Sequence, residues 1–346
     1  MTSTFFLGGS SVSGFQTKFH EVIHKPGYFT YILKGGPGTG KSTLMKKIAR
    51  HFEQCNVDLY YCSSDISSLD AVVVHDFGAV LVDGTAPHVF NADFPGITQT
   101  LVDLGQYWDR SKLQGDEQEI RRCFFENARY HRRARSFISA LSHVNGSIYD
   151  QALDTADVEG VYRAAVSIAD ALPDTGSSAG HCEYKQLAAI TSEGYKTQLL
   201  PKNCHITAVK DEWYAAGFLL LQELKGLLLQ KGYDIVVSEC ILFPENKTEH
   251  ILVPTEKILF SAVHGLNKLN LQPGVECSAF YRSSAEMLEL SHSMQAVLSL
   301  ESEAAYSIRK ALLLHDELES HYIDALCFEG LDTVTQKIMD EIERMA

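Results

Sequence analysis

Apolar residues along the first hundred positions fall in blocks typical of strands joined to helices. The run 28–33, Tyr-Phe-Thr-Tyr-Ile-Leu, is rich in β-forming residues, as a buried parallel strand should be. After it, Leu44, Ile48 and Phe52 recur every four positions with basic residues between them, which predicts an amphipathic helix. Three further strands are predicted at 57–61, 71–74 and 79–82. This alternation predicts an α/β fold with a mostly parallel, doubly wound sheet.

Two later stretches, about residues 112–171 and 284–345, have a different character. Both carry long helical patterns with few prolines and many charges. Such patterns predict helices that fold back on one another as helical hairpins. We therefore expect each α/β segment to be followed by a helical hairpin.

Short matches between the two halves of the chain indicate an internal duplication. The matching pairs are 56–64 with 232–240, 14–17 with 194–197, and 149–153 with 322–326. Matches in the same order, at a nearly constant separation of about 175 residues, are typical of a repeated unit. We predict two copies, 1–172 and 181–346, separated by a polar linker around 173–178.

Residues 35–42, Gly-Gly-Pro-Gly-Thr-Gly-Lys-Ser, match the P-loop pattern Gly-x4-Gly-Lys-Ser/Thr. The motif follows a predicted strand and opens a predicted helix, which is the setting that a P-loop requires. Glycines let backbone N–H groups converge on phosphate oxygens, and the helix N-terminus adds unpaired N–H groups and a positive dipole end. The residues predicted to bind a nucleoside triphosphate are Gly35, Gly36, Pro37, Gly38, Thr39, Gly40, Lys41, Ser42 and Thr43.

The same pattern assigns chemistry to individual side chains. We expect Lys41 to reach the β- and γ-phosphates and the Ser42 hydroxyl to bind Mg²⁺. Asp83 follows the apolar run 79–82 and is predicted to be the second magnesium group, acting through water. The alternative for Asp83 is an ordinary Asp-Gly turn at the end of a strand. In the first interpretation, Lys41 and Asp83 both act in catalysis.

Asp65 is a further candidate catalytic residue. It follows the predicted strand 57–61, at the edge of the sheet where parallel strands present their carboxyl ends and ligands bind. Asp65 could orient the attacking water or accept its proton, and a plain loop or cap aspartate is the alternative. Asp70 is a weaker rival for this role. His88 could sense the γ-phosphate or be an ordinary loop histidine.

The second copy lacks the residues that would bind phosphate. Aligned with 34–43, residues 210–219 read Lys-Asp-Glu-Trp-Tyr-Ala-Ala-Gly-Phe-Leu. The lysine and the hydroxyl of the motif are absent, and Asp211 and Glu212 would repel a phosphate. We predict that the second copy keeps the fold but does not bind a nucleotide in the usual way.

Two charged stretches each allow a functional and a structural interpretation. Residues 121–135 carry six arginines, which could supply an arginine finger or contact an acidic partner. A solvated helix face is the favoured interpretation of that stretch. His315 and Glu319 lie four positions apart on one helix face and could bind a metal, but charge on a helix surface is favoured.

Composition restricts the class of protein. The net charge of −14 disfavours general nucleic-acid binding. The eight cysteines form no Cys-x-x-Cys pair, so we expect reduced thiols and no zinc site. The sequence has no apolar stretch long enough to cross a membrane, and its N-terminus lacks the features of a secretory signal. These observations favour a cytoplasmic protein with no membrane partner.

The chain resembles a little-characterised bacterial family of duplicated P-loop NTPases whose members are known simply as ATPases. The resembling segments are 33–42, 62–65, 69–70, 82–88 and 315–319. The similarity spans the whole chain and is weakest in the helical stretches. It implies ATP binding and hydrolysis, and it implies no substrate. The degenerate second P-loop distinguishes this chain from members in which both P-loops are intact.

The function expected from these observations is Mg²⁺-dependent hydrolysis of ATP by the first copy alone. ATP is preferred to GTP because no Asn-Lys-x-Asp motif for reading guanine occurs. One alternative is a small-molecule kinase, since short P-loop kinases also place helical lids over the site. Another is a switch with negligible turnover that binds an unknown protein partner when its nucleotide is bound.

Overall fold

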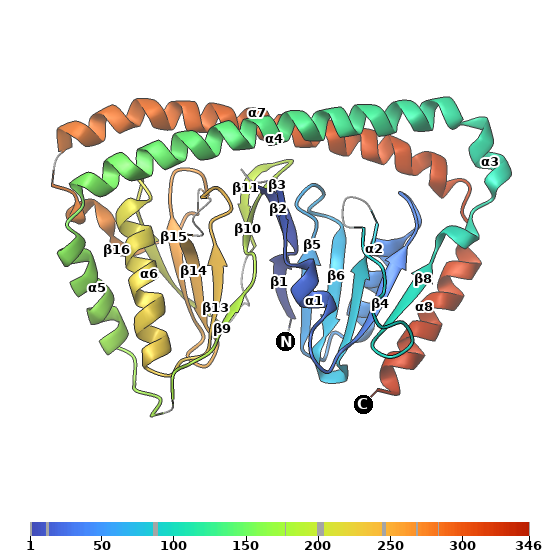
Figure 1. Ribbon diagram of the computed structural model, residues 1–346, viewed down its shortest axis with the longest axis horizontal. Helices are drawn as coiled ribbons and strands as arrows, with labels where there is room; N and C mark the ends of the chain where they lie inside the picture. The colour runs from blue at the N-terminus through green and yellow to red at the C-terminus, as the bar shows by residue number, and fades with distance from the viewer. Residues whose placement is uncertain are drawn as a thin grey trace. The chain divides into compact units, whose positions relative to one another are not determined.

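The chain forms two compact units, which are described separately below (Figure 1). The computed structural model describes residues 2–11, 14–85, 89–176, 178–198, 204–243, 247–267, 269–282 and 284–345. Side chains are described at all of these positions except 284–288. Of the sequence predictions, His88 and parts of the segments 82–88 and 173–178 lie outside the described set.

The two units do not follow the boundary predicted near residues 172–181. Unit 1 consists of Met1–Gly9, Thr17–Ala134 and Tyr306–Ala346, and unit 2 consists of Ser10–Gln16 and Arg135–Ala305. The difference arises from two long helices. Helix α4 (Glu117–Thr155) begins in unit 1 and ends in unit 2, whereas α7 (Ser284–Ile323) begins in unit 2 and ends in unit 1. Residues 306–346, from the second half of the chain, therefore belong to the unit that contains the sheet of the first half. Residues 135–171, from the first half, belong to the unit that contains the sheet of the second half.

Unit 1 contains a six-stranded sheet with the order β1-β5-β6-β7-β4-β8. Its strands are β1 (Thr2–Phe6), β5 (Val57–Tyr61), β6 (Leu69–Val74), β7 (Ala79–Asp83), β4 (Phe29–Lys34) and β8 (Gln99–Asp103). The sheet is mixed, because β6 runs antiparallel to both of its neighbours while the other pairs are parallel. The link from β6 to β7 is only the short helix η1 (His75–Phe77) and Gly78, too short for the crossover that parallel strands need.

Helices from both ends of the chain belong to unit 1. They include α1 (Phe19–Ile23), α2 (Lys41–His51), η2 (Gly105–Tyr107), α3 (Arg110–Gly115) and α8 (Phe328–Glu343). Leu44 and Ile48 of α2 share one hydrophobic core with Leu81 of β7 and with Ile338 and Ile342 of α8. Each such fully buried side chain contributes about 1.5–3 kcal/mol, so α8 is a structural part of this core.

Unit 2 repeats the topology of unit 1. Its six-stranded sheet has the order β9-β13-β14-β15-β12-β16. The strands are β9 (Cys182–Tyr184), β13 (Ile235–Glu239), β14 (Thr248–Val253), β15 (Ile258–Val263), β12 (His205–Lys210) and β16 (Pro273–Glu276). As in unit 1, only the third strand in this order, β14, is antiparallel to its neighbours. The shared order and directions confirm a duplicated α/β fold.

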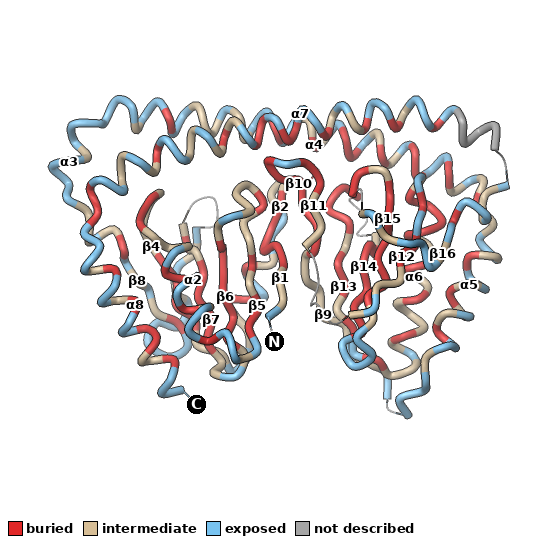
Figure 2. The backbone as a smooth tube through the Cα atoms, turned by 180° about the vertical axis from the view of Figure 1, so that it is seen from behind, coloured by how far each residue is buried: buried red, intermediate tan, exposed pale blue. Residues whose placement is uncertain are grey.

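The remaining elements of unit 2 pack around that sheet. They are α5 (Val158–Asp170), α6 (Ala215–Gln230), η3 (Cys277–Phe280) and the hairpin of β10 (Ala188–Thr191) and β11 (Gly194–Thr197). The chain also forms a short hairpin of β2 (Gly8–Ser11) and β3 (Gly14–Thr17). Figure 2 shows that the central strands of both sheets are largely buried. Among the described residues, none of the helices combines the length and apolar character needed to cross a membrane.

Candidate functional site

A glycine-rich loop, defined here as residues 35–40, connects β4 to α2 in unit 1. Gly35, Gly38 and Gly40 have φ angles of 144°, 68° and 78°. Side chains disfavour this left-handed region, so the glycines are needed for the path of the loop. Helix α2 begins at Lys41, and its N-cap residue Gly40 has no side chain to cap the first turn. The first N–H groups of α2 therefore lack side-chain acceptors, an arrangement that suits an anion.

Lys41 lies over this loop and faces a carboxylate. Its ammonium donates hydrogen bonds to the carbonyl oxygens of Gly35 (2.8 Å) and Gly36 (2.9 Å). The Lys41 Nζ is also 3.7 Å from Asp83 Oδ2, at the end of β7. The other oxygen of Asp83 accepts hydrogen bonds from the backbone N–H and the hydroxyl of Thr85. Asp83 therefore forms the predicted turn and also faces Lys41, and its magnesium role stays a prediction.

Two more side chains lie beside this pair. The Ser42 hydroxyl oxygen accepts a hydrogen bond from the backbone N–H of Leu69 (3.0 Å), which connects α2 to the start of β6. Asp70, the next residue of β6, is buried. Its pKa is raised to about 8, mainly because burial disfavours its charge and also because Asp83 is close. The sequence ranked Asp70 below Asp65, but the structure brings Asp70 into the electrostatic environment of Lys41 and Asp83.

Asp65 is bound within its own loop. Its carboxylate accepts hydrogen bonds from the backbone N–H (2.9 Å) and hydroxyl (2.7 Å) of Ser67 and from the hydroxyl of Ser68. Burial alone would raise the pKa of Asp65, but these hydrogen bonds outweigh it and the pKa lies below its usual value. A carboxylate with a low pKa is a weak proton acceptor. The geometry favours the loop-forming interpretation, and a catalytic role for Asp65 stays a prediction.

Glu319 of α7 reaches the glycine-rich loop from the other end of the sequence. The Gly38 N–H donates a hydrogen bond to Glu319 Oε1 (3.0 Å), and His315 Nε2 lies 3.4 Å from the same oxygen. The pKa of Glu319 is lowered, chiefly by its hydrogen bond with His315, and that of His315 is raised by the same contact. The pair lies on the surface of α7, as predicted for helix-surface charge, and Glu319 additionally contacts the glycine-rich loop. The sequence signal for the pair was the spacing of four positions between His315 and Glu319.

Gly38 is tightly enclosed by the same part of α7. A Cβ atom added to Gly38 would lie 2.8 Å from the Glu319 backbone oxygen and 3.1 Å from Tyr322 Cβ. We expect Gly38→Ala to destabilise unit 1 by about 2–3 kcal/mol, from left-handed strain and from overpacking. Gly40→Ala is the matched control, because its φ is similar but its Cβ would meet only the flexible Leu331 side chain at 3.2 Å. Urea denaturation of both variants measures the difference, and equal losses would contradict the steric account.

The other charged candidates have structural partners. Arg121 pairs with Glu117, and Arg122 pairs with Glu119 and Glu317, all on exposed surfaces of α4 and α7. Surface pairs of this kind contribute little, as expected of a solvated helix face. Among the described residues, no cluster of three or more His, Cys, Asp or Glu side chains is arranged to hold a metal ion.

The corresponding loop of unit 2 keeps one of the three left-handed positions and contains a buried carboxylate. Tyr214, which aligns with Gly38, has the same φ of 68°. The buried Asp211 carboxylate accepts hydrogen bonds from the backbone N–H groups of Trp213 (3.0 Å) and Gly217 (2.7 Å), and from the Tyr281 hydroxyl. Burial raises the pKa of Asp211 although these hydrogen bonds oppose the shift. Asp211 thus satisfies backbone N–H groups at the start of α6.

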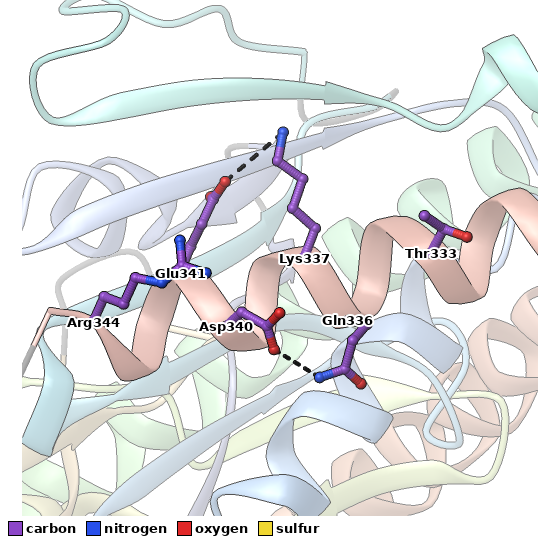
Figure 3. A pocket seen from close by; sticks show the side chains of 6 residues that line it. All are labelled: Thr333, Gln336, Lys337, Asp340, Glu341 and Arg344. Atoms are coloured by element: carbon purple, nitrogen blue, oxygen red, sulfur yellow. Dashed lines mark hydrogen bonds and ion pairs between the residues drawn. The ribbon is translucent and has the colours of Figure 1, made fainter.

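A surface groove of about 590 Å³ lies along α8 of unit 1 (Figure 3). It is lined by Thr333, Gln336, Lys337, Asp340, Glu341 and Arg344. Gln336 donates a hydrogen bond to Asp340 (2.8 Å), and Lys337 lies 3.8 Å from Glu341. These lining side chains pair with one another along the helix, and the groove contains none of the predicted site residues.

The fold and this geometry define a duplicated α/β protein with one glycine-rich, lysine-containing loop between a strand and a helix. No protein-family model, no curated protein and no solved structure matches the chain. Its function must therefore be argued from the site.

Proposed function

We propose that unit 1 binds ATP with Mg²⁺ at the glycine-rich loop and hydrolyses it. The observation that carries the proposal is the position of Lys41 at the first turn of α2, above three glycines with left-handed backbones and 3.7 Å from Asp83. This arrangement combines backbone N–H donors, a helix N-terminus and a cation at one place, as polyphosphate binding requires.

Each of these residues has a defined part in the proposed reaction. Lys41 exchanges its two carbonyl acceptors for phosphate oxygens and neutralises the charge that develops on the transferred phosphoryl group. Ser42 and Asp83 fit a magnesium site, because hydroxyl and carboxylate oxygens are the ligands that Mg²⁺ prefers and both flank the loop. Mg²⁺ held by these residues would withdraw negative charge from the phosphate chain. A water molecule then attacks the γ-phosphorus in line, the bond from that phosphorus to the bridging oxygen breaks, and ADP and inorganic phosphate leave while the proton of the water passes to a phosphate oxygen or to solvent.

Lys41→Ala tests this proposal. We expect the variant to bind MgATP at least about tenfold more weakly than the wild type and to release no phosphate, because one ammonium–phosphate contact is lost. Calorimetric titration with ATP, ADP and GTP, with and without Mg²⁺, measures the binding. An assay of free phosphate distinguishes hydrolysis from transfer to an acceptor.

Lys47→Ala is the matched control for Lys41→Ala. Lys47 lies on the same helix and carries the same charge, but it is exposed and pairs with Asp332 at the surface. We expect its MgATP affinity to equal that of the wild type. Equal phosphate release by the wild type and Lys41→Ala, with both proteins folded, would refute the proposed function.

A further inference from the structure

The anion-binding amide of the glycine-rich loop is already engaged by a carboxylate. Gly38 N–H donates to Glu319 Oε1 at 3.0 Å, and the α7 backbone is so close that no Cβ fits on Gly38. A polyphosphate bound to this loop needs the same N–H, because the convergent backbone donors of the loop are what a phosphate chain contacts. The Glu319 carboxylate and a phosphate group cannot both accept this hydrogen bond.

We propose that Glu319 is a built-in competitor of the phosphate chain, and that it must leave Gly38 before the glycine-rich loop binds a triphosphate. This inference rests on the proposed function of unit 1, and it adds a mechanism that regulates the same site. The ligand class that competes with Glu319 is an inorganic or nucleoside polyphosphate.

The second unit supplies an internal comparison. There, Asp211 occupies the corresponding helix start through the N–H groups of Trp213 and Gly217. Asp211 belongs to the loop itself and is only 3% exposed, so the site is closed by a residue that cannot withdraw. In both units, a carboxylate of the protein takes the place suited to an anion. The two units differ in where that carboxylate comes from.

Glu319, in contrast, is placed so that it can exchange. Its side chain is 36% exposed, and it comes from α7 rather than from the loop. His315, also on α7, lies 3.4 Å from Glu319 Oε1, so the carboxylate keeps a charged or hydrogen-bonding partner when it releases Gly38. Repulsion between Glu319 and an arriving phosphate favours that release. The carboxylate that occupies the glycine-rich loop of unit 1 can therefore be displaced, whereas the carboxylate at the corresponding place in unit 2 is fixed.

Removing the competitor should strengthen phosphate binding. We expect Glu319→Ala to bind tripolyphosphate and MgATP about tenfold more tightly than the wild type, since a charge-assisted hydrogen bond no longer has to be broken. Glu319→Gln keeps an acceptor for Gly38 but removes the charge, and we expect an intermediate gain. Calorimetric titration gives both affinities, and thermal unfolding confirms that each variant is folded.

Glu317→Gln is the matched control for these variants. Glu317 lies on the same helix but pairs with Arg122 rather than with the loop, so its affinity should equal that of the wild type. Affinities in both Glu319 variants equal to or weaker than that of the wild type would overturn the inference. Failure of the proposed function would give a different result. In that case neither the wild type nor any Glu319 variant would bind MgATP, or Lys41→Ala would bind MgATP as tightly as the wild type.

Discussion

Replacing Glu249 by alanine is expected to destabilise unit 2 by about 3–5 kcal/mol, the range observed when one partner of a buried ionic pair is removed. Glu249 lies on β14 with no exposed surface. Its carboxylate accepts hydrogen bonds from the Tyr195 hydroxyl (2.8 and 2.9 Å) and pairs with His264 Nε2 at 2.8 Å. Alanine removes the carboxylate acceptor from both of these buried partners and also creates a cavity.

The pH dependence of this loss follows from the pKa of Glu249. Burial would raise that pKa, but the charges of His250 and His264 and the hydrogen bonds from His264 and Tyr195 outweigh it, so the pKa lies below 4.5. A carboxyl with a depressed pKa stabilises the folded state above its unfolded-state pKa, and this stabilisation is lost as the pH falls. The difference in the free energy of unfolding between the wild type and Glu249→Ala should therefore be largest near neutral pH. It should become smaller below about pH 4.5.

Urea denaturation at several pH values measures both effects. Fluorescence of Trp213, which belongs to unit 2, can be followed in a Trp108→Phe background because the chain has only two tryptophans. Glu249→Gln is the control, since it keeps the shape and an acceptor oxygen and should lose less stability than alanine. A loss below about 1 kcal/mol in Glu249→Ala would show that the pair adds no more than an ordinary hydrogen bond.

The local elements of unit 1 were predictable because their signals are local. The predicted strand 28–33 corresponds to β4, and the predicted helix after the glycine motif corresponds to α2. The β-forming run and the spacing of Leu44 and Ile48 are sufficient for these assignments. The duplication was also predictable. Packing still requires the same topology in both halves, so weak sequence matches remain in the same order.

The composition of the units was not predictable from the same patterns. The amphipathic face of α8 contributes Leu331 and Ile338 to the core of unit 1. The spacing of these residues shows that one helix face is buried, but it does not show which sheet covers it. Helices of 39 and 40 residues each contribute residues to both units, and the sequence gives no signal for where the division falls within each helix. The contact of Glu319 with Gly38 was hidden for the same reason.

Unit 2 keeps one left-handed position of the loop although residues with side chains stand at the places of its three glycines. Tyr214 retains the left-handed conformation of the glycine that it replaces, at a cost of about 1–2 kcal/mol. Its buried ring contacts the rings of Phe218, Phe243 and His264, and this packing offsets the strain. The sequence predicted loss of phosphate chemistry there, and the structure adds that aromatic packing and Asp211 hold the loop in its place.

Replacing Asp83 by asparagine is expected to reduce Mg²⁺-dependent ATP hydrolysis about 10- to 100-fold, which is typical when a group that holds a metal through water is altered. Asparagine has the same shape and keeps an acceptor for the N–H of Thr85, so the turn after β7 should survive. The variant loses the charge that faces Lys41 and would attract the ion. Raising the Mg²⁺ concentration should restore part of the activity, because the defect lies in metal affinity.

Asp332→Asn separates this effect from a general change of charge in unit 1. Asp332 is 68% exposed and pairs only at the surface with Lys47, so its hydrolysis rate should match that of the wild type at every Mg²⁺ concentration. Phosphate release measured across a magnesium titration distinguishes the variants. If the hydrolysis rate of Asp83→Asn depends on Mg²⁺ concentration as that of the wild type does, Asp83 has a role in the turn alone. The proposed ion would then be bound through Ser42 without Asp83. A rate that stays low at saturating Mg²⁺ would instead place the role of Asp83 in the chemical step, through its contact with Lys41.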